Sequence, residues 1–450
     1  MHSLTEPARQ TPIRAEVDVL VVGGGAAGVA AGVSAARQGA RTLLVERYGF
    51  LGGTLTAVTL GSICGQYAVD GEERVSKVVA GFCDEVVARL DELGGARPVF
   101  RWLDAATTPY DPFLMRVVLD RLTEEAGVGV LFHSLLVDVV RGDDGRLTHA
   151  VFQGRDGRWV VAARSFVDAS GDGDLMALAG APFETDTAAQ QFPTAMFRFG
   201  GVDTDTAGRM KRPDLHAALE RAVADGMELP RTAGGLFVIH PGAMHANITR
   251  IAHGDRSPDV LDSDELSAAE RLGRSQIARY LEAFRRHVPG FAEAYISDAG
   301  VHLGVRESRR LRGRHVLTAD EVLGLARFDD SIGLSGWPLE EHGAGRATRW
   351  VWLENGGAYE IPFRVLVPAA GPANLLVAGR CLSADHDAHA SARVAAQCFV
   401  MGEAAGIAAA LAAPARTPMS EIDTGAVRAI LAGRGALLAR AEASPAGAVP

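Results

Sequence analysis

The sequence predicts an α/β fold in which a parallel sheet is assembled from separate stretches of the chain, with an α+β segment inserted between them. Three observations support this prediction. A complete β-α-β unit occupies residues 17–46, two later strands run into glycine-rich turns at residues 169–173 and 379, and the alternation of strands and helices is lost between residues 182 and 350. Strands that alternate with helices are typical of a parallel sheet covered by helices on both faces.

The β-α-β unit reads VDVLVVGGGAAGVAAGVSAARQGARTLLVE. Residues 17–22 form a largely apolar run, as expected for a strand that is buried on both faces. A helix is expected over residues 26–38, Gly39 ends it, and residues 42–45 form the second strand.

The turn between the first strand and the helix carries a G-x-G-x-x-G motif. Gly23 permits the tight turn, Gly25 allows a pyrophosphate to approach the backbone, and Gly28 lets the helix pack closely on the strand. The first helical residues, Ala26 and Ala27, offer free N–H groups and the positive end of the helix dipole to a phosphate. We therefore expect a Rossmann-like nucleotide site here.

Glu46 ends the second strand, eighteen residues after Gly28. An acidic side chain in this place can accept hydrogen bonds from the 2′- and 3′-hydroxyls of a ribose. The carboxylate favours a mononucleotide or dinucleotide without a 2′-phosphate. A glycine-rich turn alone would be weak support, but here the strand, the helix and the glutamate occur together in the expected order.

Three later stretches distinguish between FAD and NAD, which share this unit. Gly52 and Gly53, in RYGFLGGTLTAV, allow a close backbone approach that a plain NAD dehydrogenase does not need at that point. WVVAARSFVDASGDGDLMALAG and IPFRVLVPAAGPANLLVAGR each bring a further strand to a tight turn. A helix that contains Gly402 and Gly406 is expected to follow over residues 392–412.

With GVRESRRLRGRHVLTADEVL and the loop CLSADHDAHASARV, these motifs resemble the FAD-dependent oxidoreductases that have a glutathione-reductase-type FAD domain. More narrowly, residues 17–412 are similar to a bacterial family of FAD-dependent oxidoreductases whose members are sometimes described, mistakenly, as xanthan lyases. Several long motifs in the right order are more specific than any one of them. The resemblance implies a Rossmann-like FAD domain with an inserted α+β cap.

The resemblance also implies which residues hold FAD. Glu46 would bind the AMP ribose, the first turn would bind the pyrophosphate, and Val137 would lie beside the adenine. The implied cofactor residues are Gly23, Gly25, Ala26, Ala27, Gly28, Glu46, Arg47, Gly52, Gly53, Thr54, Val137, Ala169, Gly171, Asp172, Gly379, Arg380, Gly402 and Gly406. Many flavoproteins of this fold have Gly-Asp or Gly-Glu where this chain has Gly379-Arg380, and Asp385 is the alternative carboxylate for the ribityl chain.

Five segments are predicted along the chain. They are an N-terminal tail (1–16), the first part of the FAD domain (17–181), the substrate cap (182–350), the second part of the FAD domain (351–412), and a C-terminal helix and tail (413–450). In the cap, a long helix with Ser263 as N-cap is expected to stop at Pro289-Gly290. A second G-x-G-x-x-G and a Cys-x-x-x-x-Cys motif are absent, which argues against a dedicated NAD(P)H domain and against disulfide reduction.

The loop between the last strand and the final helix is expected to reach the reacting ring, with the helix N-terminus directed at the flavin. His389 and Arg393 have the His-x-x-x-Arg spacing of the fumarate reductase and succinate dehydrogenase flavoproteins, where the histidine helps to hold a substrate carboxylate. The alternative is that His389 caps the helix or hydrogen-bonds the flavin. His386 is expected in an exposed loop. A metal site is not expected, because H-x-x-H lacks a third ligand here.

Two further catalytic candidates lie in the predicted cap. Arg306, in VRESRR, has the bidentate fork that suits carboxylate or phosphate recognition, although a network with Glu307 that joins cap and nucleotide domain is an equal alternative. His342, in GWPLEEH, matches a histidine that is common in the family, and histidine is the usual general base near neutral pH. We expect His240 and His245 to be structural.

Composition limits the classes of partner. A formal net charge of −10 argues against nucleic acid and anionic membranes, which attract cationic patches. Four scattered cysteines, Cys381 among them, fit a reducing compartment and neither a disulfide framework nor a zinc cage. Cys381 is expected to be a small buried residue rather than a covalent flavin anchor. The N-terminus has no signal-peptide pattern, so a soluble cytoplasmic protein is expected.

The leading hypothesis is an FAD-dependent dehydrogenase or oxidase that transfers hydride between a small organic substrate and flavin N5. Oxygen or a separate carrier would be the electron acceptor, and a homo-oligomer is possible. The alternatives are an FAD- and NAD(P)H-dependent monooxygenase and a non-redox flavoprotein that resembles thiazole synthases or is structural.

Overall fold

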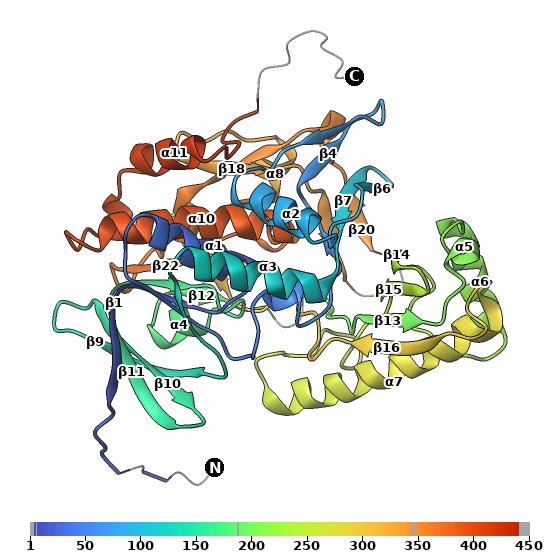
Figure 1. Ribbon diagram of the computed structural model, residues 1–450, viewed down its shortest axis with the longest axis horizontal. Helices are drawn as coiled ribbons and strands as arrows, with labels where there is room; N and C mark the ends of the chain where they lie inside the picture. Colours follow the sequence, from blue (N-terminus) through green and yellow to red (C-terminus); the bar gives the residue numbers. More distant parts are fainter. Residues whose placement is uncertain (1–3, 6, 187–188, 344–347, 441–450) are drawn as a thin grey trace.

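A mixed seven-stranded sheet forms the centre of the larger part of the molecule (Figure 1). The computed structural model describes residues 4–5, 7–186, 189–343 and 348–440. The strand order is β8-β2-β1-β11-β10-β9, with β22 also paired to β11; β8, β2, β1, β11 and β22 run parallel, and β9–β10–β11 is an antiparallel meander. The strands are β1 (Ile13–Val22), β2 (Thr42–Val45), β8 (Gly129–Leu131), β9 (Leu135–Arg141), β10 (Leu147–Gly154), β11 (Gly157–Asp168) and β22 (Leu375–Val377).

The predicted β-α-β unit is present as β1, α1 (Ala26–Arg37) and β2. The strand β1 is longer than expected and begins at Ile13, because its first residues pair with the long strand β11 from Val160 onward. The last four residues of β1 are buried, as required of a strand that has helices on one face and the meander on the other.

The final helix differs from its prediction. Instead of one helix over residues 392–412, the structure has α9 (His386–Ala392) and α10 (Ala395–Ala412), separated at Arg393 and Val394. Val394 is the N-cap of α10 and has an extended backbone, which breaks the helix there. Among the described helices, α10 has the length and hydropathy of a membrane span, but 89% of it is buried inside the structure, as in a core helix.

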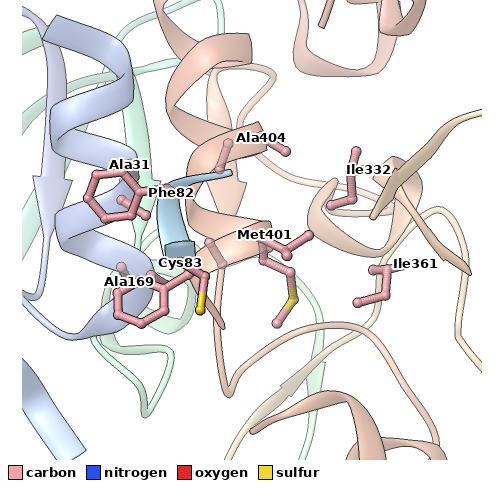
Figure 2. Packing of buried hydrophobic residues seen from close by; sticks show 14 of the residues in the cluster. Ala31, Phe82, Cys83, Ala169, Ile332, Ile361, Met401 and Ala404 are labelled. Carbon is pink, nitrogen blue, oxygen red and sulfur yellow. The ribbon is translucent and has the colours of Figure 1, made fainter. Parts of the chain in front are cut away.

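The helix α10 lies beside α1 at the centre of the larger hydrophobic core. Figure 2 shows Met401 and Ala404 of α10 between Ala31 of α1 on one side and Ile332 and Ile361 on the other. This buried position explains why α10 is apolar on most of its surface, with Gln397 and Glu403 as its polar residues. Through this contact, α10 near the end of the chain packs against α1 near its start.

The cap is a four-stranded antiparallel sheet in the order β14-β15-β13-β16, covered by helices, at one side of the molecule (Figure 1). Its own hydrophobic core lies between Ala195 and Leu303. Leu317, Ile332 and Leu339, which fall within the predicted cap segment 182–350, pack in the larger core instead. The cap elements are β13 (Phe197–Gly200), β14 (Gly235–His240), β15 (Ala243–Asn247), β16 (Tyr295–Ala299), α5 (Thr204–Ala207), α6 (Arg212–Ala224) and α7 (Ser263–His287).

The long helix α7 ends before Pro289-Gly290, as expected, but its N-cap is Asp262 and not Ser263. The Asp262 carboxylate accepts hydrogen bonds from the backbone N–H groups of Asp264 and Glu265, both at 2.9 Å. Aspartate and serine are similar N-cap residues, so the sequence pattern could not choose between neighbouring candidates.

Short elements surround the large sheet and carry parts of the site. The remaining helices are α2 (Phe82–Glu92), α3 (Pro112–Glu125), α4 (Asp174–Leu178), α8 (Ala319–Leu323) and α11 (Thr424–Gly433). The remaining strand pairs and triplets are β3 (Ser62–Ile63), β7 (Ala105–Pro109) and β6 (Phe100–Trp102); β4 (Tyr67–Val69) and β5 (Val75–Lys77); β12 (Phe183–Glu184) and β17 (Arg310–Leu311); β18 (Ser331–Ser335) and β21 (Tyr359–Pro362); and β19 (Leu339–Glu341) and β20 (Arg349–Val351).

Candidate active site

One continuous cavity of about 950 Å³ connects the large sheet with the cap. At one end its walls are the residues that directly follow parallel strands: 25–27 after β1, 46–48 after β2, 169–171 after β11 and 378–380 after β22. Open α/β sheets bind ligands at the carboxyl ends of their strands, so this end is the dinucleotide groove. The other end lies under β14 and β15 of the cap.

Glu46 is held in place for a ribose in the dinucleotide groove. One of its carboxylate oxygens, Oε2, accepts a hydrogen bond from the Gly24 N–H at 2.6 Å, and the other, Oε1, accepts one from the Tyr48 N–H at 2.8 Å. Each oxygen keeps a further lone pair for a hydroxyl. Tyr48 also stacks on His302, with ring centroids 5.3 Å apart, and both rings line the cavity.

The glycine turn before α1 has the geometry that a pyrophosphate requires. Gly25 is the N-cap of α1 and has no side chain to satisfy the first helical N–H groups. A Cβ at Gly25 would meet nothing nearer than the Gly53 Cα at 3.8 Å, whereas a Cβ at Gly28 would lie 1.8 Å from the Gly23 carbonyl oxygen. The second glycine therefore leaves room for a ligand, and the third serves close packing. These features fit FAD: the free N–H groups would hold its phosphates, and Glu46 would accept hydrogen bonds from its ribose hydroxyls.

The structure separates the eighteen predicted cofactor residues into two groups. Twelve line the cavity: Gly25, Ala26, Ala27, Glu46, Arg47, Gly52, Gly53, Thr54, Ala169, Gly171, Gly379 and Arg380. Six lie outside its lining: Gly23, Gly28, Val137, Asp172, Gly402 and Gly406. Gly23 and Gly28 shape the turn, and Val137 lies within β9 of the meander.

Gly402 and Gly406 serve helix packing and not cofactor contact. A Cβ at Gly402 would lie 2.1 Å from the carbonyl oxygen of Ala27, and a Cβ at Gly406 would lie 2.1 Å from that of Ala31. Real side-chain atoms do not approach a backbone so closely, so these glycines allow α10 to lie against α1.

Asp172 and Arg380 form a buried network behind the groove. The Arg380 guanidinium donates to Asp172 Oδ1 at 2.7 Å and to the Ser308 hydroxyl at 2.9 Å. Burial alone would raise the pKa of Asp172, but Arg380 and Arg47 outweigh it and hold that pKa well below its usual range. The network ties the turn after β11 to the turn after β22 and to the chain before β17.

Asp385 does not take the place of the missing carboxylate after β22. Its side chain caps α9 by accepting from the Ala388 N–H at 2.7 Å, and it also accepts from the Ala319 N–H at 2.8 Å. It lies outside the cavity lining. The alternative role that the sequence offered for Asp385 is therefore wrong.

His342 lines the cavity at the end under the cap and forms a pair with Glu340. The His342 Nε2 lies 2.9 Å from Glu340 Oε1, and the Trp337 indole N–H donates to Glu340 Oε2 at 3.1 Å. Burial and the neighbouring Arg306 lower the pKa of His342 to about 3, although Glu340 opposes them. The imidazole is therefore neutral near pH 7, with its proton on Nε2 toward Glu340 and a lone pair on Nδ1, 3.3 Å from the Thr348 hydroxyl.

Of the four predicted catalytic residues, Arg306, Arg393 and His342 line the cavity, and His389 does not. His389 is fully buried, and its Nε2–H donates to the Arg380 carbonyl at 2.6 Å. Burial lowers the pKa of His389 to about 3, so it is neutral. His389 therefore supports the turn after β22 and does not cap the helix, because the N-cap of α9 is Asp385.

His386 is not in an exposed loop, contrary to the prediction. It is the first residue of α9, and its Nδ1 lies 2.9 Å from Glu307 Oε2. The hydrogen bond to Glu307 raises the pKa of His386. Glu307 also pairs with Arg310 at 3.0 Å, so the network expected between cap and nucleotide domain exists, but it uses Glu307 and Arg310, while Arg306 faces the cavity.

The other predicted histidines and Cys381 have varied surroundings. His240 lies 2.7 Å from Asp111, and Arg97 donates to its other nitrogen at 2.8 Å. His245 is fully buried and lines the cavity beside Phe237, with no hydrogen-bond partner in the described part of the chain. Cys381 is fully buried, as expected of a small core residue.

Sequence reasoning missed Arg231, Glu340 and a group of tryptophans that line the cavity: Trp102, Trp337 and Trp350. The Trp102 ring centroid lies 5.4 Å from that of Trp350 and 6.3 Å from that of Trp337. Glu340 could have been found, because a residue two positions before His342 on a strand lies on the same face. Nothing local marks Trp102 or Arg231, which come from distant elements.

Comparison with known proteins identifies the family of the chain. The sequence model of the family described as FAD dependent oxidoreductase matches residues 18–431. Aklavinone 12-hydroxylase DnrF from Streptomyces peucetius subsp. caesius is 28% identical over 253 residues, which is 48% of this chain and 51% of that protein. The chain thus matches only about half the length of this curated relative.

Two solved structures show the degree of structural likeness. A geranylgeranyl bacteriochlorophyll reductase-like protein from Thermoplasma acidophilum has a TM-score of 0.48 at 14% identity, covering 93% of this chain and 84% of that one. OxyS anhydrotetracycline hydroxylase from Streptomyces rimosus has a TM-score of 0.43 at 13% identity, covering 93% and 67%.

The family match extends from β1 to α11, so it includes the strands that border the groove and the cap sheet. The chain belongs to the FAD dependent oxidoreductase family, and it is an enzyme with FAD as its cofactor.

Proposed function

We propose that this oxidoreductase is a dehydrogenase or oxidase that transfers hydride between a small organic substrate under the cap and FAD. The observation that supports this most is the continuity of the cavity from the dinucleotide groove to the chamber beside His342. FAD, when bound, supplies the hydride acceptor at N5. The chain must then bind the substrate, exclude water and handle one proton.

His342 is the group that we propose for the proton. Its neutral Nδ1 can accept a proton from a substrate hydroxyl or amine, and Glu340 keeps the other nitrogen protonated and orients the ring. The tryptophan rings beside it form a wall that keeps water from the reacting atoms. Oxygen or a separate electron carrier would regenerate the oxidised enzyme.

A second candidate is an FAD- and NAD(P)H-dependent monooxygenase. One observation favours it: the curated relative is named as a hydroxylase. The likeness covers about half of that protein, and it leaves open whether this chain uses NAD(P)H.

Anaerobic mixing tests the proposal. FAD-loaded protein is combined in turn with alcohols, amines, hydroxy acids and NAD(P)H, and the visible flavin band is followed. Bleaching by an organic substrate, with recovery of its oxidised product, supports a dehydrogenase or oxidase. Bleaching by NAD(P)H alone, followed by a hydroxylated product after air is admitted, supports the monooxygenase instead. A flavin that no compound reduces would contradict both and would favour a non-redox role.

A further inference from the structure

Three arginines line the chamber around His342: Arg231, Arg306 and Arg393. Arg231 is 5% exposed and Arg306 is 7% exposed. None of the three has a carboxylate within salt-bridge distance in the described part of the chain. Buried guanidinium groups normally pair with an anion, because an unpaired buried charge is costly. The chamber therefore has unmatched positive charge.

Hydrogen bonds connect the side chains of these three arginines to His342 through intermediate residues. Arg393 donates to the Gln191 Oε1 at 2.9 Å. The same oxygen accepts from the backbone N–H of His342 at 3.4 Å. Arg231 donates to the Thr348 hydroxyl at 3.2 Å, which in turn contacts the His342 imidazole at 3.3 Å.

Arg306, the third arginine, is connected to His342 through the backbone of Phe192. It donates to the Phe192 carbonyl at 2.6 Å, and the Phe192 N–H donates to the His342 carbonyl at 2.9 Å. Each of the three guanidinium groups is thus at most two hydrogen bonds from His342. Each donates to a neutral acceptor, which fixes its position. Among the described residues, Glu340 is the one acid whose charge acts favourably on all three, so the three guanidinium groups outnumber it.

The acidic groups of the chamber do not balance the arginines. Three acids line the cavity among the described residues: Glu46, Asp205 and Glu340. Glu46 is committed to the dinucleotide groove, Asp205 is exposed on α5, and Glu340 holds His342 and Trp337. Burial lowers the pKa of Arg306 well below its ordinary value, and the neighbouring Arg393 adds to this effect while Glu340 opposes it.

The chamber also has an apolar side, formed by Trp102, Trp337 and Trp350. Flat indole faces and edges suit an aromatic or similarly flat apolar group. The binding site therefore combines a cationic end with an aromatic wall. A ligand that matches both must have an anionic group attached to an apolar body.

We propose that the substrate of this site is an organic acid with a flat apolar body, whose carboxylate is bound by Arg231, Arg306 and Arg393 and whose body packs on the tryptophans. The inference rests on the proposed function in that it names the substrate class of the same site. An arginine fork can bind either a carboxylate or a phosphate, so phenyl phosphate is included in the test as the competing anion.

The bound acid has a consequence for His342. The charged groups around the imidazole are Glu340 on one side and Arg306, Arg231 and Arg393 on the other. A carboxylate at the arginines offsets their repulsion of a proton on His342, so it makes this histidine a stronger base. The substrate thus helps to prepare the group that receives its proton.

The test compares acids with their neutral amides in binding to the FAD-loaded protein. The probes are phenylacetate, indole-3-acetate, the two corresponding amides and phenyl phosphate, measured by calorimetry and by perturbation of the flavin spectrum. We expect each acid to bind more tightly than its amide by about ten-fold or more, as for a charge-assisted hydrogen bond that the amide lacks. Equal binding of acid and amide, no binding of either acid, or tighter binding of phenyl phosphate than of phenylacetate would overturn the proposal.

Single substitutions test which arginines bind the carboxylate. Arg306→Gln and Arg393→Gln are each expected to remove about ten-fold or more of the affinity for the acids while leaving that for the amides unchanged. Arg271→Gln makes the same change on the exposed surface of α7 and is expected to bind every probe like the wild type. The comparison of acid with amide on the wild type needs no variant, so a misfolded variant does not weaken the test.

The two proposals can fail separately. Acid-selective binding by a protein whose flavin no organic compound reduces would keep the inference and reject the hydride transfer. Reduction of the flavin by neutral substrates as fast as by the matching acids would keep the hydride transfer and overturn the inference.

Discussion

Gly402 of α10 lies so close to Ala27 of α1 that a Cβ at Gly402 would be 2.1 Å from the Ala27 carbonyl oxygen. Gly406, one turn further along α10, meets Ala31 in the same way. Ala27 lines the dinucleotide groove, so the spacing between the two helices also determines where the N-terminus of α1 stands. A change at Gly402 therefore affects both the stability of the fold and the affinity for FAD.

We predict that Gly402→Ala lowers the free energy of unfolding by about 1–3 kcal/mol, the usual range for overpacking a core. Denaturant unfolding of the FAD-free protein measures this, and titration with FAD should show weaker binding as well. Gly433→Ala is the matched control, since Gly433 is exposed at the end of α11 with open space around it, and alanine is the better helix former. A Gly402→Ala variant as stable as the wild type would contradict the close packing.

The nucleotide-binding unit could be predicted from the sequence because its determinants are local. The strand, the glycines, the helix and Glu46 all lie within residues 17–46, and their spacing alone specifies the turn. The role of Gly402 could not be predicted in this way, because it depends on a helix that lies more than 360 residues earlier in the chain. A glycine in a helix pattern has the same appearance whether it faces a cofactor or another helix.

The chamber under the cap was predictable only in part. His342 and Arg306 were chosen for their residue types, but their partners come from many elements: Trp102 from β6, Thr348 from the chain before β20, and Arg231 from the loop before β14. His389 was misplaced for a related reason. The break between α9 and α10 directs Arg393 to the cavity, whereas His389 points to the Arg380 carbonyl.

Replacing Glu46 tests its role in holding the cofactor. Glu46→Gln keeps the shape of the side chain but removes its charge. It also replaces one acceptor oxygen with an N–H₂ donor, which would face the donor N–H of Gly24 or of Tyr48. We predict that the dissociation constant for FAD rises by about ten- to a hundred-fold, the loss expected when charge-assisted hydrogen bonds are removed. Fluorescence titration of the FAD-free protein measures it. Glu293→Gln, on the exposed surface of the cap, should leave the constant unchanged, and an equal constant for Glu46→Gln would exclude a ribose contact.

His342→Gln tests the proposed proton acceptor. Once a substrate that reduces the flavin is identified, stopped flow measures the rate of flavin reduction. The rate in His342→Gln should be lower than in the wild type by about 10²–10⁴-fold, the range for a lost general base. Affinity for FAD should stay the same, because His342 lies at the other end of the cavity. Because the pKa of His342 is about 3, the wild-type rate should decline only as the pH falls toward that value, and this decline should vanish in the variant. His253→Gln on the cap surface is the control, and an unaltered rate in His342→Gln would reject the role.

The buried imidazole of His245 makes the stability of the fold depend on pH. Burial and, to a smaller extent, Arg198 lower the pKa of His245 from 6.5 to about 3, so the folded protein keeps His245 neutral while the unfolded chain takes up a proton below about pH 6.5. The contribution of His245 to the free energy of unfolding is fully present above about pH 6.5 and is lost as the pH falls toward 3. Between about pH 7 and about pH 5 the loss amounts to about 2 kcal/mol for one such histidine. Denaturant unfolding of His245→Gln should show a pH dependence weaker by that amount, whereas His253→Gln should follow the wild type. Parallel curves for His245→Gln and the wild type would mean that the pKa of His245 is the same in the folded and unfolded protein.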